Sequence, residues 1–159
     1  MRVLHVHERA GFYGGVEQIL YDTARGLGLL GWPQGLLHRD FAPQPEFAAA
    51  FEQASSRESI LQDFAPDVLF LHKVEQADDV RRLAERLPTV RMVHDHDLVC
   101  MRRHKYFPIS SRVCDRPAGL DCYLHLCFIQ RASAGSRLPI SFGSVAERRS
   151  RFPGITLIE

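Results

Sequence analysis

The chain lacks several features that would place it in a specialised class at once. No apolar run approaches the roughly 20 residues that a membrane-spanning helix needs. Charges at Arg2, Glu8 and Arg9 do not fit a secretory signal peptide, so we expect a cytoplasmic protein. There is no internal repeat and no low-complexity tract. The net charge of +1 by itself indicates no partner, and we expect no nucleic acid among the partners.

The glycine-bearing loop near the N-terminus lacks both common nucleotide-binding fingerprints. It contains neither G-x-G-x-x-G nor G-K-[ST], which sets aside a dinucleotide fold and a phosphate-binding P-loop. Residues 2–7 alternate as a strand does, and apolar residues at helical spacing follow over residues 16–27. Gly14 and Gly15 lie between them, where backbone can approach a ligand and adopt positive φ, and where the helix start offers free N–H groups. Plain turn chemistry is the alternative interpretation.

Composition places the chain among globular proteins. It has 159 residues, 45% of them hydrophobic and 25% charged, which is one domain in length and enough for a sizeable core. Acidic residues dominate residues 1–97, with a net charge of −5, whereas residues 98–159 carry +6. This asymmetry hints at an anionic ligand or membrane surface near the later half, and a solvated face is the alternative.

Strand and helix patterns alternate along the first hundred residues. Strands are predicted at residues 2–7, 67–72 and 89–94, with a weaker one at 32–38 whose Pro33 suits an edge strand. Helices are predicted at residues 16–27, 46–53, 56–64 and 76–87, the third capped by Ser55 or Ser56. The run at 67–72 is apolar enough for a strand buried on both faces. This order predicts parallel βαβ units and a Rossmann-like α/β fold, with a mostly parallel sheet flanked by helices.

Three of the predicted strands run into a histidine at the carboxyl end. These are His7, His72 and His94. Each alone is an ordinary residue at the end of an element, but ligands of parallel sheets bind at the carboxyl ends of the strands. We therefore interpret this edge of the sheet as a polar site.

Four stretches together resemble one enzyme family. They are GGVEQ at residues 14–18, PDVLFLHK at 66–73, VRMVHDHDLVC at 90–100 and CDRPAGLDCYLHLC at 114–127. Their order and spacing are similar to the N-terminal part of family 4 glycosyltransferases, up to about residue 127. The resemblance implies the N-terminal, acceptor-side half of a GT-B fold over residues 1–159, with a cysteine-rich insertion at about 98–130.

The resemblance also implies what is missing. The donor-binding C-terminal domain, which grips the nucleotide-sugar, is absent, and ITLIE at residues 155–159 suits the start of an interdomain linker. We therefore expect that the chain alone transfers no sugar. The implied partners are a nucleotide-sugar donor, bound through the missing domain, and a saccharide or lipid-linked acceptor, with peripheral contact at the inner face of the membrane.

Roles for individual residues follow from the resemblance. Gly14 and Gly15 would approach the diphosphate or the reacting sugar of the donor, and His94 would face the donor sugar as the catalytic residue. Asp95 would orient His94 or cap the next segment. The family suggests retention of anomeric configuration, and transfer through His94 requires no cofactor. Glu17 is interpreted as a first-turn partner of the helix dipole and nothing more.

Basic residues follow the implied site directly. Arg102 and Arg103 would hold the phosphate or diphosphate of an anionic acceptor, because guanidinium groups pair well with phosphate oxygens. A solvated surface is the alternative interpretation of this basic run.

All four cysteines fall within one segment. Cys100, Cys114, Cys122 and Cys127 have the number and kind of ligands for a structural zinc ion, yet C-x13-C-x7-C-x4-C lacks paired C-x2-C knuckles. Reduced structural thiols, a disulfide or an iron–sulfur cluster are the alternatives. On a regular helix Cys122 and Cys127 would point about 140° apart, so both bind one metal only if the backbone departs from a helix.

Two other function classes stay open. One is a non-catalytic module that binds a phosphorylated ligand or a protein and carries a zinc-stabilised cysteine-rich arm. The other is a metal-dependent enzyme that uses His5, His7, His94 and His96, since residues two apart on a strand share a face.

Overall fold

The chain forms two compact units, Met1–His94 and Asp95–Glu159. A computed structural model describes residues 1–74, 77–96, 99–100, 102, 104–107, 109–110, 112–117, 119–131 and 140–142. The predicted cysteine-rich segment belongs to the second unit, and the proposed linker at residues 155–159 lies outside the described residues. Among the described residues, no helix has the length and apolar character to cross a membrane.

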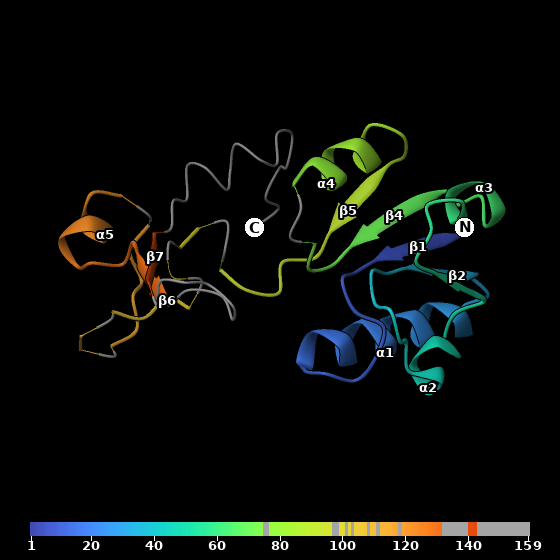
Figure 1. The fold of residues 1–159 in the computed structure, drawn as a ribbon, viewed down its shortest axis with the longest axis horizontal. Helices are drawn as coiled ribbons and strands as arrows, with labels where there is room; N and C mark the ends of the chain where they lie inside the picture. The colour runs from blue at the N-terminus through green and yellow to red at the C-terminus, as the bar shows by residue number, and fades with distance from the viewer. Residues whose placement is uncertain are drawn as a thin grey trace. The chain divides into compact units, whose positions relative to one another are not determined.

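The first unit is built on one parallel sheet (Figure 1). The strands are β1 Val3–Val6, β2 Gln34–Leu37, β3 Gln53–Ser55, β4 Val68–Leu71 and β5 Thr89–Arg91. Their order across the sheet is β3-β2-β1-β4-β5, and every neighbouring pair is parallel. The predicted Rossmann-like α/β architecture is thereby confirmed.

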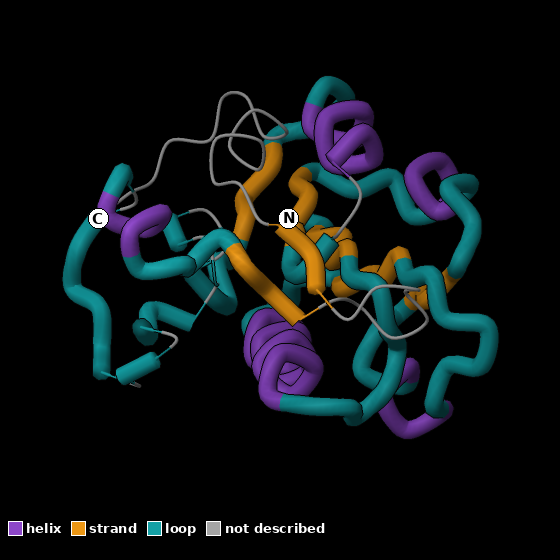
Figure 2. Tube along the Cα trace, turned by 60° about the vertical axis from the view of Figure 1, so that its left-hand side comes forward, coloured by secondary structure: helices purple, strands orange, loops and turns teal. Residues whose placement is uncertain are grey.

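Helices lie on both faces of this sheet. They are α1 Gly15–Leu29, α2 Pro45–Ala48, α3 Ile60–Asp63 and α4 Ala77–Ala84. The ribbon and the tube views place α1 and α2 on one face and α3 and α4 on the other (Figures 1 and 2). The sheet switches direction between β1 and β4, because the chain leaves these two neighbouring strands toward opposite faces.

The core follows from the apolar faces of these elements. On the α1 side, Leu20, Ala24, Leu36, Phe47 and Phe51 are buried together. Each Leu or Phe side chain of this cluster that is removed from water contributes about 1.5–3 kcal/mol. Strand β4 is covered less completely than its apolar run predicts: Leu69 and Leu71 are buried, but Val68 and Phe70 are only half-buried.

Two expectations about the region around β2 are wrong. Strand β2 is internal, because β3, which the sequence did not predict, pairs on its outer side. The helical pattern at residues 46–53 stops after α2, and the Glu52 N–H instead donates to the Gln34 carbonyl at 2.8 Å. Pro33, which has no N–H to donate, precedes β2. Its carbonyl accepts the Val3 N–H at 3.0 Å.

The N-cap of α3 is neither Ser55 nor Ser56, the two residues that the sequence predicted. Ser59 occupies the N-cap position of α3 and makes no side-chain capping bond. Ser55 lies in β3, and its hydroxyl accepts the Arg57 N–H at 3.0 Å, which closes the turn that leads to α3.

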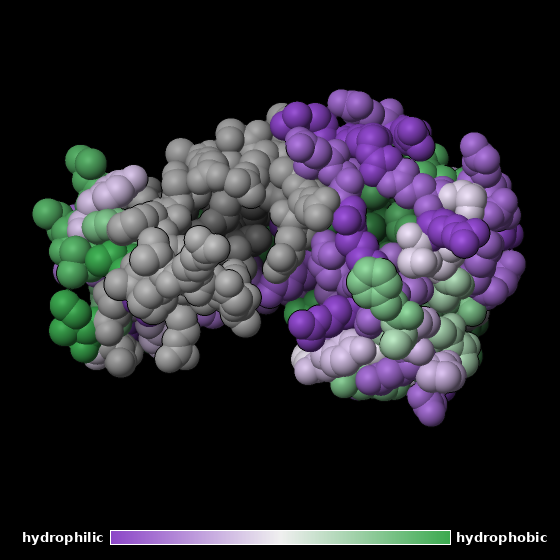
Figure 3. All heavy atoms as spheres, viewed as in Figure 1, coloured by the Kyte–Doolittle hydropathy of each residue, from purple (hydrophilic) through white to green (hydrophobic). Residues whose placement is uncertain are grey.

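The second unit is built from short elements. An isolated antiparallel bridge joins Tyr106 and Val113, α5 spans Asp121–Leu124, and β6 Ile129–Arg131 pairs antiparallel with β7 Ile140–Phe142. Its one buried residue, among those whose burial is described, is Cys127. Apolar side chains gather on the surface around α5 (Figure 3), where Leu120 and Leu124 are 83% and 80% exposed.

Candidate functional site

Histidines gather at the carboxyl edge of the parallel sheet. His7 follows β1, His72 follows β4, and His94 lies three residues beyond β5. Gly14, on the loop after β1, belongs to the same edge. Ligands of open α/β sheets bind at this edge near the switch point, which here lies between β1 and β4.

A chain of hydrogen bonds joins three imidazoles to a buried amide. His5 Nε2 lies 2.7 Å from Gln34 Oε1, and His5 Nδ1 lies 3.0 Å from His72 Nε2. His72 Nδ1 in turn lies 3.0 Å from His94 Nε2. The rings of His72 and His94 are stacked at 5.3 Å. His5 lies 67 residues from His72 and 29 residues from Gln34 in the sequence. The parallel pairing of β1 with β2 and β4 brings these side chains into one series of hydrogen bonds.

The amide at the start of this chain sets the direction of every bond. Gln34 Nε2 donates to the Trp32 carbonyl at 2.7 Å, so Gln34 Oε1 faces His5 and accepts from His5 Nε2–H. Neutral His5 then accepts at Nδ1 from His72 Nε2–H, and neutral His72 accepts at Nδ1 from His94 Nε2–H. Neutral His94 therefore carries its lone pair on Nδ1.

Burial keeps the inner two imidazoles uncharged. Burial, together with a smaller effect of the neighbouring His5, His94 and His7, lowers the pKa of His72 to about 2. Burial likewise lowers the pKa of His5 to about 4, although its hydrogen bond to Gln34 acts in the opposite direction. Both rings are thus neutral at physiological pH, as the directed chain requires.

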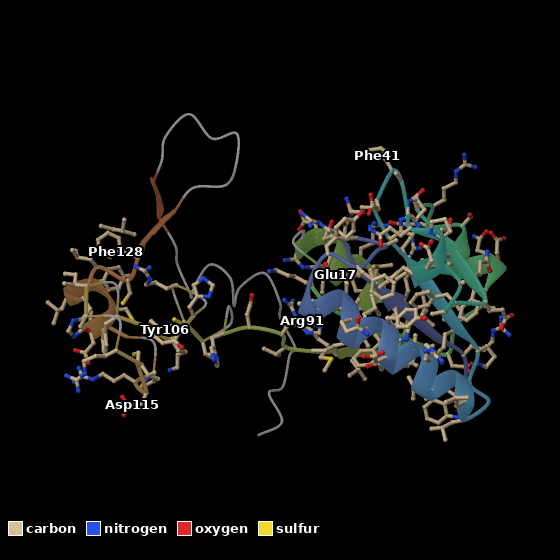
Figure 4. The ribbon with its side chains drawn as sticks, turned by 90° about the horizontal axis from the view of Figure 1, so that it is seen from below. Glu17, Phe41, Arg91, Tyr106, Asp115 and Phe128 are labelled. Atoms are coloured by element: carbon tan, nitrogen blue, oxygen red, sulfur yellow. The ribbon has the colours of Figure 1, made fainter. Side chains whose placement is uncertain are left out.

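Glu17 lies beside this series of hydrogen-bonded histidines, a position that the sequence did not predict. It is 8% exposed on the first turn of α1 (Figure 4), and its Oε1 is 3.2 Å from His7 Nε2. Among the described residues, no partner is found for the buried His7 Nδ1. In the sequence, a carboxylate in the first turn of a helix is explained by stabilisation of the helix dipole alone. The contact between Glu17 and His7 therefore becomes visible only in the fold.

We expect Glu17→Ala to lower the free energy of unfolding by about 1–3 kcal/mol, because it leaves His7 Nε2 buried without its acceptor. Urea denaturation followed by Trp32 fluorescence measures this. Asp22→Ala removes an exposed carboxylate from the same helix and should change the value by less than about 0.5 kcal/mol. Equal effects of the two substitutions would contradict a buried Glu17–His7 contact.

The glycine pair does not have the backbone conformation that we expected. Gly14 is extended, with φ −177° and ψ −168°, and Gly31 is the one described glycine with positive φ. A Cβ at Gly14 would lie 3.4 Å from Glu17 Oε2, and a Cβ at Gly15 would meet nothing within 4 Å. The two glycines therefore keep the start of α1 unobstructed and relieve no strain.

A polar pocket of about 220 Å³ opens at the same edge. His7 and His38, which follow β1 and β2, line it together with Arg39 and Asp79. His38 Nδ1 is buried and, like His7 Nδ1, has no partner among the described residues. Burial lowers the pKa of His38, although Asp40 acts in the opposite direction. The lining of the pocket thus includes two buried imidazoles, each with one ring nitrogen that has no hydrogen-bond partner among the described residues.

The remaining predicted site residues belong to the second unit. Asp95 and Arg102 are described there, whereas Arg103 lies outside the described residues. Arg102 lies near the cysteines, since its charge lowers the pKa of Cys127. Burial has the larger effect and raises this pKa.

The four cysteines approach one another in the second unit. The thiols of Cys122, Cys100 and Cys114 each raise the pKa of Cys127 in addition to the effect of burial. None of the four cysteines forms a disulfide. Across the described part of the chain, no three His, Cys, Asp or Glu side chains stand in ligand geometry around one point. For the sheet-edge metal alternative, both nitrogens of His5 are already engaged.

Comparison of the chain with protein-family models, with curated proteins and with solved structures gives no match. We therefore infer a function from the geometry of the carboxyl edge and the chemistry of its side chains.

Proposed function

We propose that residues 1–94 form the acceptor-side half of a glycosyltransferase site, in an enzyme of GT-B architecture. The observation that carries this proposal is the directed chain from Gln34 through His5 and His72 to His94, at the carboxyl edge of the sheet. The unobstructed start of α1 at Gly14 and Gly15 supports it, because helix N–H groups stabilise the negative charge of a leaving diphosphate.

The pKa of His72 limits what His94 can do. A proton passed inward from His94 would have to reside on His72, whose pKa of about 2 makes this unfavourable. The chain therefore orients His94 and fixes its tautomer and does not store a proton. In the proposed reaction, the His94 imidazole faces the donor sugar as the catalytic residue, which needs no metal.

The pocket lined by His7 and His38 supports a saccharide acceptor. The pocket lies at the edge of the sheet where His94 lies, and its polar lining suits sugar hydroxyls. The roles of Asp95 in orienting His94 and of Arg102 and Arg103 in binding an anionic acceptor remain proposals from the sequence alone. The nucleotide-sugar donor would bind a second α/β domain.

The proposal is tested by ligand binding and by transfer. Purified 1–159 should show saturation-transfer NMR signals with saccharides or with uridine- and guanosine-diphosphate sugars. Gly15→Leu should weaken this binding at least about tenfold, which corresponds to about 1.4 kcal/mol. Gly28→Leu is the matched control, because a Cβ at either glycine meets nothing within 4 Å.

Transfer assays separate the proposal from its alternatives. Purified 1–159 should release no nucleoside diphosphate from a nucleotide-sugar, because the proposed donor domain is not part of residues 1–159. Turnover by 1–159 alone would refute this requirement. Absence of binding to every sugar in the panel at millimolar concentration, or equal binding by both glycine variants, would contradict the proposed site.

A further inference from the structure

The end of α5 reverses the chain between two cysteines. The Cys127 N–H donates to the Cys122 carbonyl at 2.8 Å, and the Leu126 N–H donates to the Tyr123 carbonyl at 3.1 Å. Leu126 has φ +54°. These two bonds and the left-handed residue define a Schellman motif, in which the positions of Cys122 and Cys127 normally make a side-chain contact.

This motif overturns the expectation from regular helical spacing. Instead of pointing about 140° apart, as helical geometry predicts, the side chains of Cys122 and Cys127 pack against each other. The left-handed position is usually a glycine, and a leucine there costs roughly 1 kcal/mol. The chain therefore accepts local strain where the two thiols come together.

A hairpin brings the second cysteine, Cys114, back beside Lys105. The bridge between Tyr106 and Val113 continues into a bond from the Cys114 N–H to the Lys105 carbonyl at 2.6 Å. Cys114 thus lies beside a residue only five positions after Cys100. Figure 4 marks Tyr106 and Asp115 in the hairpin region and Phe128 just after the Schellman turn.

The second unit has little apolar packing to hold this arrangement. Cys127 is its one buried side chain among those described, while Ile109 and Val113 are 85% and 71% exposed. Units this small that bury so little surface usually need a disulfide, a metal ion or a partner for stability.

We propose that Cys100, Cys114, Cys122 and Cys127 together bind one structural zinc ion, independently of the proposed sugar transfer. Zn²⁺ takes four thiolates in tetrahedral geometry at about 2.3 Å. The described side chains do not have ligand geometry, so zinc binding would draw the thiols of Cys100 and Cys114 toward those of Cys122 and Cys127 at the Schellman turn. The nearby charge of Arg102 would offset part of the negative charge of a four-thiolate site.

The test is the metal content of the full chain 1–159, expressed with zinc in the medium. Inductively coupled plasma mass spectrometry should find about one zinc per chain, as the four-thiolate stoichiometry requires. Cys122→Ser and Cys127→Ser should each lose most of it. His125→Ala is the matched control. It removes an imidazole that lies between Cys122 and Cys127 in the sequence but is not among the four proposed ligands, so it should keep the zinc.

A second readout guards against variants that merely misfold. Wild-type chain stripped with a chelator should take up one Co²⁺ and develop the visible bands of tetrahedral thiolate coordination, and trypsin should cut the second unit faster without metal. Four thiols that all react with a thiol reagent in zinc-treated protein would overturn the proposal. So would a disulfide mass shift, bound iron instead of zinc, or loss of zinc in His125→Ala.

Discussion

Lowering the pH from 7 to 5 is expected to remove about 4 kcal/mol from the free energy of unfolding of the first unit. The cause is the pair of buried imidazoles, because the folded-state pKa of His5 is about 4 and that of His72 about 2. In the unfolded chain both return to about 6.5. Each group then contributes about 1.4 kcal/mol per pH unit below that value.

The unfolding free energy falls with the pH because the unfolded state binds more protons than the folded state. Below pH 6.5 the unfolded chain protonates His5 and His72 and the folded chain does not, so acid favours unfolding. The contribution is fully present above pH 6.5 and is lost for His5 as the pH falls to about 4, and for His72 down to about 2. Urea denaturation at several pH values, followed by Trp32 fluorescence, measures it.

A single variant separates this effect from general acid sensitivity. His72→Gln keeps an amide that can donate and accept within the chain, but it removes one of the two proton sites. The slope of the unfolding free energy against pH between 6 and 5 should fall by about half. Unfolding free energies that stay constant between pH 7 and 5 in the wild type would contradict neutral, buried imidazoles.

The fold was largely predictable because hydrophobic patterning specifies it directly. Alternating strands and helices led to a parallel sheet flanked by helices, which the structure has. Strand β3 was missed because Gln53–Ser55 has no apolar alternation of its own, and the alanine-rich stretch before it has a helical pattern. The edge position expected for β2 was wrong for the same reason, since the missing strand pairs beside it.

The candidate site was predictable only in part. Histidines at strand ends are visible in the sequence, but their contacts depend on register. Because Val6 pairs with Leu71, His5 lies opposite Phe70, and His72 follows Phe70 by two residues. Leucine at position 126 likewise hid the Schellman turn, since glycine is the residue that usually marks one.

Gly35 is the position in the sheet where an added side chain should be most damaging. It lies in β2, and a Cβ there would be 3.0 Å from Leu4 Cδ1 and 3.0 Å from ring carbons of Phe64. Both neighbours are buried, with 0% and 1% of their surface exposed, so neither moves freely. We expect Gly35→Ala to lower the unfolding free energy by about 1–2 kcal/mol and Gly35→Val by about 3 kcal/mol.

The same substitution in α1 should have the opposite sign. Gly26 is exposed in the middle of that helix, and a Cβ there meets nothing within 4 Å. Gly26→Ala should therefore raise the unfolding free energy by about 0.5–1 kcal/mol through helix propensity alone. Urea melts of both alanine variants at pH 7 compare the two directly. Because the chemical change is identical, a stabilising Gly35→Ala would mean that β2 does not pack against Leu4 and Phe64 as described.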